Sequence, residues 1–148
     1  MKPTLLFPRL SAQRLITARE VLLRRDCMSR LQEWIEAKGY CTRGVTISDL
    51  SNFIGTNRTT LSQYINQEFQ LSFRDWINHY RCDEAVRQWT EQPNLTVYEV
   101  AEICGFSSRK YFDLVFSACK GVSPSKYWKE NKRIGMNESA PDSEREAE

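Results

Sequence analysis

The chain has 148 residues, of which 41% are hydrophobic, and this size and composition suit one small domain with appendages. The net charge of +2 at pH 7 is unevenly distributed: +4 over residues 1–39, +2 over residues 40–133 and −4 over residues 134–148. A basic body with an acidic tail suits a polyanionic partner, although it also suits any soluble protein. The apolar runs are too short to span a bilayer.

Five widely spaced cysteines and a single histidine, His79, argue against a metal site or a disulfide framework. No Cys-x-x-Cys motif occurs, and closely spaced Cys/His ligands are missing. We expect free thiols that act as small core groups in a reducing compartment, and therefore a cytoplasmic protein. The sequence has neither a Gly-rich phosphate loop nor a nucleophile–base arrangement. We predict no enzyme activity, no catalytic residues, no metal and no cofactor.

The N-terminal forty residues predict one helix. Residues 1–10 contain two prolines and are expected to lack fixed structure. Over residues 12–37 apolar side chains recur at steps of three and four, and Gly39 stands where a helix would end. This helix could be a linker or dimerisation element, or it could pack on the surface of the following domain; both interpretations stay open.

An internal repeat with an offset of fifty residues follows. It matches Thr46–Ile65 (TISDLSNFIGTNRTTLSQYI) with Thr96–Phe116 (TVYEVAEICGFSSRKYFDLVF), with one extra residue after the second glycine. In each unit an acidic residue stands three positions after the threonine, which is the pattern of a capping box. The apolar positions that match on one helix face are Ile47 with Val97, Leu50 with Val100, and Ile54 with Cys104.

The repeat also contains a matching corner, with Gly55 in the first unit and Gly105 in the second. A tight turn between two helices favours glycine, because glycine reaches positive φ without a Cβ clash. Phe106 is expected to fill the second corner. The next helix should begin at a small polar N-cap: Asn57 in the first unit, and Ser107 or Ser108 in the second. Two such corners in register predict two helix-turn-helix motifs.

Between the two units, Ser72–Gln92 predicts one long helix, which Ser72 can cap and Pro93 ends. About twenty residues give a rod of roughly 30 Å, close to one turn of duplex DNA at roughly 34 Å. Such a rod could place two recognition helices in successive major grooves. Because no segment shows clean strand alternation, we predict an all-α fold with two helix-turn-helix subdomains, a central linker helix and an extra N-terminal helix.

These elements divide the chain into three parts. Residues 134–148 are acidic, lack aromatic side chains and are expected to form a disordered tail. The three parts are an N-terminal extension (1–41), a bipartite domain (42–133) and this tail (134–148). Within the bipartite domain, motif 1 lies at about 46–69, the linker helix at 72–92 and motif 2 at about 96–120.

Specific residues extend this pattern. They are Ile103, Gly105-Phe106, Tyr111-Phe112, Val115-Phe116 and the exit Gly121–Tyr127, together with Ser72-Phe73, Trp76-Ile77, Arg81 and Ala85. Over about Thr42–Arg133 the chain resembles the DNA-binding domain of AraC/XylS-type bacterial transcription regulators. The resemblance implies a bipartite, seven-helix module that binds double-stranded DNA, with RNA polymerase as a candidate second partner.

Members of that family usually carry a sensing or dimerising domain as well, commonly before this module. The resemblance therefore implies that the chain is the C-terminal DNA-binding fragment of a longer regulator, with a stand-alone form as the alternative. We expect no small-molecule effector to bind the fragment itself.

In this family the recognition helices contact bases from their N-terminal halves. Carried over by position, the resemblance implies base contacts from Thr59, Ser62 and Gln63 in motif 1 and from Arg109, Lys110 and Asp113 in motif 2. Arginine or lysine can donate to guanine O6 and N7, and glutamine can pair with adenine. Asp113 could accept from cytosine N4, or it could order Arg109 through an i,i+4 pair.

Four further residues stand at helix N-termini, where side chains and backbone amides can hold phosphates. They are Asn57 and Arg58 in motif 1, and Ser107 and Ser108 in motif 2.

The chain departs from the family pattern by carrying fewer cations. Where Phe-Lys-Lys is common at the end of each recognition helix, it has Ile65-Asn66-Gln67 and Phe116-Ser117-Ala118, and Leu114 stands where a basic residue is frequent. Gln70 replaces a glycine, and Trp128 replaces an arginine. With fewer phosphates neutralised, we predict weak, salt-sensitive DNA binding. The alternative is a protein-interaction module on a degenerate helix-turn-helix scaffold with little DNA affinity.

Overall fold

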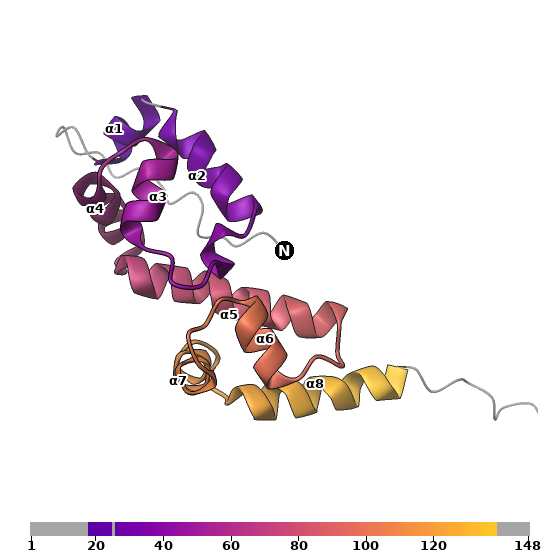
Figure 1. Ribbon diagram of the computed structural model, residues 1–148. Coiled ribbons are helices and arrows are strands. Elements are labelled where there is room, and N and C mark those ends of the chain that lie inside the picture. Colours follow the sequence, from indigo (N-terminus) through magenta and orange to yellow (C-terminus); the bar gives the residue numbers. More distant parts are fainter. Residues whose placement is uncertain (1–17, 25, 139–148) are drawn as a thin grey trace, which may run out of the picture. The chain divides into compact units, whose positions relative to one another are not determined.

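The computed structural model describes residues 18–24 and 26–138, and every regular element in these ranges is helical (Figure 1). This confirms the all-α prediction. None of the described helices is both long and apolar enough to cross a membrane. In chain order the elements are α1 (Ala18–Arg24), α2 (Cys27–Glu36), the 3₁₀ turn η2 (Gly39–Cys41), α3 (Ile47–Ile54), α4 (Arg58–Phe69), α5 (Phe73–Glu91), α6 (Val97–Ile103), α7 (Arg109–Lys120) and α8 (Pro124–Glu138).

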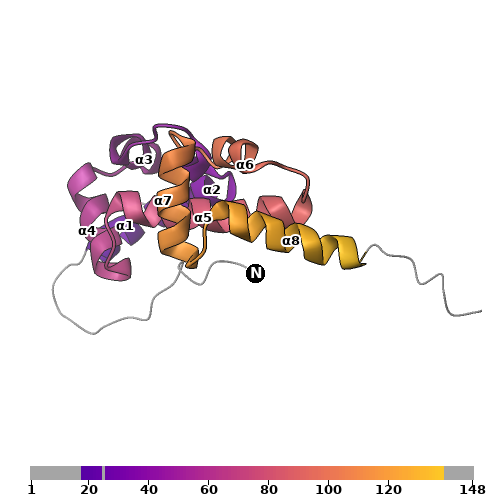
Figure 2. The same cartoon turned by 90° about the horizontal axis from the view of Figure 1, so that it is seen from below.

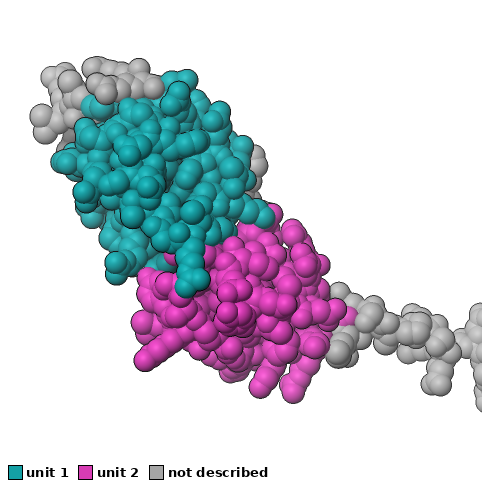
Figure 3. All heavy atoms as spheres, viewed as in Figure 1, with its two compact units in different colours: residues 1–80 teal, residues 81–148 magenta. Residues whose placement is uncertain are grey.

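The chain divides into two compact units, residues 1–80 and residues 81–148, which have different colours in Figure 3. The boundary falls within α5, so this helix contributes to both units. Each unit contains one pair of helices joined by a short turn: α3 and α4 in unit 1, and α6 and α7 in unit 2. The two predicted helix-turn-helix subdomains and the helix between them are therefore present.

The N-terminal region differs from the single helix predicted over residues 12–37. Two helices, α1 and α2, occupy its described part, and Asp26 before α2 adopts a left-handed conformation with φ 58°. A right-handed helix cannot continue through such a residue, and aspartate is among the few non-glycine residues that tolerate this conformation. Residues 1–10, for which the sequence predicts no fixed structure, and residues 12–17 lie outside the described ranges.

Both N-terminal helices pack into the core of unit 1. Leu22 of α1 and Leu31 of α2 are buried in one cluster with Leu50 of α3 and Leu61 of α4. Each such side chain contributes about 1.5–3 kcal/mol of burial free energy. Of the two interpretations left open for this segment, packing against the domain is the one that these contacts support.

The core of unit 2 is built around Trp89 of α5, which is fully buried. Its ring centroid lies 6.2 Å from that of Phe112, 5.8 Å from that of Phe116 and 5.8 Å from that of Tyr127. Its indole nitrogen donates to the carbonyl oxygen of Leu95 over 3.1 Å, so the polar atom is satisfied. Trp89, Phe112 and Phe116 are core residues, and the half-buried Tyr127 of α8 packs against them, so that these rings hold α7 in place.

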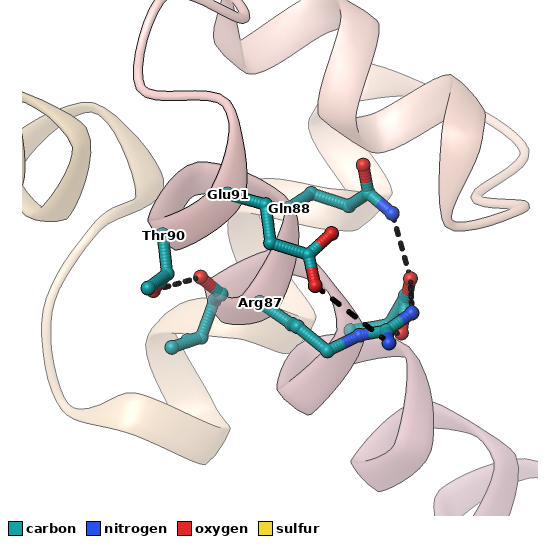
Figure 4. Close-up of polar contacts among 6 residues, drawn as sticks. Arg87, Gln88, Thr90 and Glu91 are labelled. Carbon is teal, nitrogen blue, oxygen red and sulfur yellow. Dashed lines mark hydrogen bonds and ion pairs between the residues drawn. The ribbon is translucent and has the colours of Figure 1, made fainter.

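A buried carboxylate in the C-terminal half of α5 is also satisfied. Glu84 is 3% exposed, and it accepts hydrogen bonds from Nε and Nη2 of Arg87 at 2.9 and 2.7 Å and from the amide of Gln88 at 2.7 Å. Arg87 also lies 3.9 Å from Glu91 one turn later (Figure 4). Such charge-assisted bonds offset the cost of burying a carboxylate, and they fix these side chains along α5.

The last helix is longer than predicted. A tail is predicted from residue 134, but α8 continues to Glu138, and its C-terminal turns extend away from α7 in both views (Figures 1 and 2). The helix pattern of Tyr127, Trp128 and Ile134 extends across the predicted boundary, whereas the prediction relied on composition alone. The remainder of the predicted tail, residues 139–148, lies outside the described ranges.

Candidate nucleic-acid interface

Both motifs begin with the same capping box, as predicted. In motif 1 the backbone N–H of Asp49 donates to Oγ1 of Thr46 over 3.2 Å, and the Asp49 carboxylate accepts from the Thr46 backbone over 2.8 Å. In motif 2 the matching distances between Thr96 and Glu99 are 3.2 and 2.7 Å. Hydrogen bonds from the hydroxyl and the backbone N–H of Thr46 lower the pKa of Asp49, and the backbone N–H and hydroxyl of Thr96 lower the pKa of Glu99.

The two corners share one backbone geometry. Gly55 and Gly105 adopt φ values of 80° and 83°, the left-handed region that glycine reaches without a Cβ clash, as predicted. The residue after each glycine donates its N–H to the carbonyl oxygen five residues back, over 2.9 Å to Ser51 in motif 1 and 3.0 Å to Ala101 in motif 2. This bond closes the end of the first helix and turns the chain toward the second.

Phe106 fills the second corner, as predicted. Its side chain is 3% exposed, and its ring centroid lies 4.7 Å from that of Phe112 and 6.1 Å from that of Tyr111. The guanidinium carbon of Arg81 lies 5.7 Å from the same centroid, a cation–π contact with the N-terminal end of unit 2. The corner is thus held by packing as well as by backbone geometry.

The second helix of each motif begins at a side-chain N-cap. Oδ1 of Asn57 accepts from the backbone N–H of Thr60 over 2.8 Å, and Oγ of Ser108 accepts from that of Tyr111 over 3.1 Å. The structure thereby settles the choice between two serines: Ser108 is the cap of α7, and Ser107 is an exposed residue before it. The exposed N-termini of α4 and α7 fit the phosphate-contact role expected of these residues.

The two faces of α4 differ in polarity. Leu61, Tyr64 and Ile65 are buried. The exposed positions are all polar: Arg58, Thr59, Ser62, Gln63, Asn66 and Gln67. The expected base-contacting residues of motif 1 therefore lie together on the solvent face of α4, at steps of three and four along it.

The solvent face of α7 is mixed. Phe112 and Phe116 are buried, while the residues that are exposed or half-buried include Arg109, Lys110, Asp113, Leu114, Ser117 and Ala118. All of the expected base-contacting residues of motif 2 are accessible. The face also contains an apolar residue that the expected set omits, Leu114.

Arg109 is engaged by two neighbours. Its Nε lies 3.3 Å from Oδ1 of Asp113, and its Nη2 donates to Oγ of Ser125 in α8 over 3.0 Å. The i,i+4 pair is one of the two roles considered for Asp113. It orients Arg109 along α7, and about two-fifths of the arginine side chain stays exposed.

A second ion pair fixes the C-terminal end of α7. Nζ of Lys120 lies 2.6 Å from Oδ1 of Asp83 in α5. Burial opposes the charge on this lysine, but the hydrogen bond and the negative charge of Asp83 outweigh it and raise the pKa of Lys120. With Arg109 and Lys120 paired, Lys110 is the one cation of the fully described helix α7 that has no ion pair.

A signal for Leu114 was available in the sequence. After the corner the repeat runs with an offset of fifty-one residues, so that the buried Leu61 matches Phe112 and the exposed Gln63 matches Leu114. Positional equivalence alone would have added this residue to the set. The contact of Arg109 with Ser125 has no comparable signal, because it depends on how α8 packs against α7.

The geometry defines a bipartite helix-turn-helix domain with two solvent-exposed second helices. The model of the family described as "Helix-turn-helix domain" matches residues 50–130, more than half of the chain. The chain belongs to this family, in agreement with the resemblance to AraC-type regulators found in the sequence.

Two curated relatives illustrate the match. The transcriptional activator NphR from Rhodococcus sp is 31% identical over 121 residues, which cover 82% of this chain and 35% of NphR. The uncharacterized transcriptional regulatory protein YesN from Bacillus subtilis is 32% identical over 72 residues, which cover 48% of this chain and 20% of YesN. The chain thus spans between a fifth and about a third of these relatives.

Two solved structures share the fold. The DNA-binding domain of AdpA in complex with a target DNA has a TM-score of 0.61 at 23% identity, covering 71% of this chain and 95% of that chain. A transcriptional regulator with an AraC-type DNA-binding domain from Chromobacterium violaceum has a TM-score of 0.60 at 18% identity, covering 72% and 95%. At these identities the likeness establishes the fold alone.

Proposed function

We propose that this chain is the DNA-binding part of a sequence-specific transcription regulator. The observation that supports this most directly is the repeated motif, in which each second helix buries one apolar face and exposes the other at its N-terminal half. A helix presented in this way fits the major groove, where base edges can be distinguished. The family, and the relatives named as regulators, agree with this assignment.

The residues divide into two roles in this proposal. Thr59, Ser62 and Gln63 on α4, and Arg109, Lys110 and Asp113 on α7, contact bases. Asn57, Arg58, Ser107 and Ser108 at the helix N-termini contact phosphates and fix the register on the duplex. The pair between Asp113 and Arg109 would present the guanidinium to a guanine rather than leave it disordered.

The proposal includes two adjacent major-groove sites, one for each motif. The nineteen residues of α5 correspond to roughly 28 Å, comparable with one turn of duplex. Because the chain spans only part of its relatives, it would act as the DNA-binding fragment of a longer regulator, in the cytoplasm, where the DNA is.

Fluorescence anisotropy with duplexes selected from a random pool tests the proposal. We expect saturable binding that weakens steeply with salt. Lys110→Ala should weaken binding, and if Lys110 contacts phosphate the loss should be uniform across sequences, with a salt slope shallower by about one. Gln63→Ala should cost about 1–3 kcal/mol and relax specificity at one adenine. Lys129→Ala and Gln92→Ala, at exposed positions outside α4 and α7, are the matched controls.

A second candidate function has one observation in its favour, the small number of available cations. On α7 two of the three cations are already paired, and α4 contains only Arg58. The same scaffold could dock on RNA polymerase or another regulator instead. Failure of the wild-type chain to bind random duplex at low salt would favour this candidate and contradict the first.

A further inference from the structure

Leu114 is the most exposed large hydrophobic side chain in the described ranges, at 69%. It lies one turn after Lys110 and one turn before Ser117, on the face of α7 opposite the buried Phe112 and Phe116. Such a side chain adds almost nothing to the core of unit 2. Its position on the solvent face suggests that it is used in a contact with a partner.

The internal repeat indicates which partner. Leu114 occupies the position of Gln63 in motif 1, just as Lys110 occupies that of Thr59 and Asp113 that of Ser62. All of these side chains lie on the solvent face of their second helix. Leu114 therefore occupies, in motif 2, the position from which motif 1 presents Gln63, its candidate for pairing with adenine.

We propose that Leu114 contacts the 5-methyl group of a thymine in the major groove, an inference that rests on the proposed function. Thymine is the one standard DNA base with a methyl group in the major groove, and apolar side chains recognise it by contact. Leucine offers neither donor nor acceptor, so it cannot pair with the polar edges of the other bases. Motif 2 would then require a thymine beside the base contacted by Lys110.

Replacing thymine by deoxyuridine isolates this methyl group, because base pairing is unchanged. Starting from a duplex selected by the wild-type chain, each thymine is replaced in turn and the affinity is measured by anisotropy. We expect one position at which deoxyuridine weakens wild-type binding about fourfold, because the burial free energy of one methyl group is lost. For Leu114→Ala the thymine-to-deoxyuridine ratio at that position should fall to about one.

Two further variants make the result specific. Ile134→Ala removes an apolar side chain that is 60% exposed on α8, and it should keep the fourfold ratio. Leu114→Gln introduces the residue type that motif 1 carries at the matching position, Gln63, and it should shift the selected base from thymine to adenine. Because Leu114 is exposed, none of these changes should lower the melting temperature measurably.

The outcomes separate the inference from the proposed function. If the wild-type chain binds its selected duplex but no thymine shows the effect, or Leu114→Ala retains it, the thymine contact is wrong while DNA binding stands. If the wild-type chain binds no duplex, both the thymine contact and the proposed function fail.

Discussion

At the scale of single residues, Phe106 decides whether the second corner holds its shape. The side chain is buried between α6 and α7 and contacts Phe112. We expect Phe106→Ala to lower the free energy of unfolding of unit 2 by about 3–5 kcal/mol, because the corner would keep a cavity. Urea denaturation followed by tryptophan fluorescence measures this, with Leu114→Ala as the exposed control. An unchanged midpoint would show that the ring does not support the corner.

Gln70 is a second residue whose backbone matters. It ends α4 at φ 52°, where glycine is the usual residue, and its side-chain amide donates to the carbonyl oxygen of Gln67 over 3.1 Å. Gln70→Gly removes the Cβ clash of the left-handed conformation and should stabilise unit 1 by about 1 kcal/mol. Gln70→Ala is the matched control, because it also loses the side-chain bond but keeps the Cβ. The prediction fails if the glycine variant is no more stable than the alanine variant in thermal unfolding.

At the scale of elements, the two capping boxes give the first helix of each motif a dependence on pH. The pKa of Asp49 and of Glu99 is lowered in the folded state by the hydroxyl and backbone N–H groups of the cap. A lowered folded-state pKa stabilises the protein above the unfolded-state pKa, near 4, and this stabilisation is lost as the pH falls through the folded-state value.

We therefore expect the wild-type unfolding free energy to decrease as the pH falls below about 5, and the double variant Asp49→Asn, Glu99→Gln to show a flatter profile. Chemical denaturation between about pH 6 and pH 3 measures the difference. Glu130→Gln, at an exposed carboxylate of α8, should leave the profile unchanged. Parallel profiles for the double variant and the wild type would argue against the capping boxes as its source.

The sequence was most informative where one local rule decides the outcome. The capping threonines, Gly55 and Gly105 could be assigned in advance because each position has one dominant physical requirement. A cap needs a side-chain acceptor and a tight corner needs positive φ, and the repeat shows the cap and the corner glycine once in each unit. The break at Asp26 could not be assigned in advance, because the apolar Leu23 and Cys27 stand on either side of it and are four residues apart, which is one helical step. Only the packing of α1 and α2 against the first motif selects two helices over one.

Part of the candidate site likewise depends on tertiary structure. The expected base-contacting residues of α4 and α7, which the family resemblance implied by position, are all exposed or half-buried. The ion pair of Lys120 with Asp83 and the bond of Arg109 to Ser125 connect residues 37 and 16 positions apart. Periodicity says nothing about such pairs, yet they determine which cations are available to a polyanion.

At the scale of the whole molecule, few cations of the second helices are available to neutralise the phosphates of DNA. Arg58 begins α4 and Lys110 lies in the first turn of α7, whereas Arg109 and Lys120 are held by carboxylates. Each phosphate neutralised contributes about −0.9 to the slope of log affinity against log salt. The isolated chain should therefore bind weakly at physiological salt, and a nanomolar dissociation constant there would contradict this.

The double variant Arg58→Ala, Lys110→Ala tests this whole-molecule view in one measurement. If Lys110, like Arg58, contacts a phosphate rather than a base, the salt slope of this double variant should be shallower than that of the wild type by about 1.8, twice the contribution of one contact. Lys126→Ala, Lys129→Ala is the matched control, since it removes two exposed lysines of α8 and the same net charge. Equal salt slopes for the two double variants would mean that affinity depends on the overall charge of the chain. Arg58 and Lys110 would then contribute no more than any other pair of exposed cations.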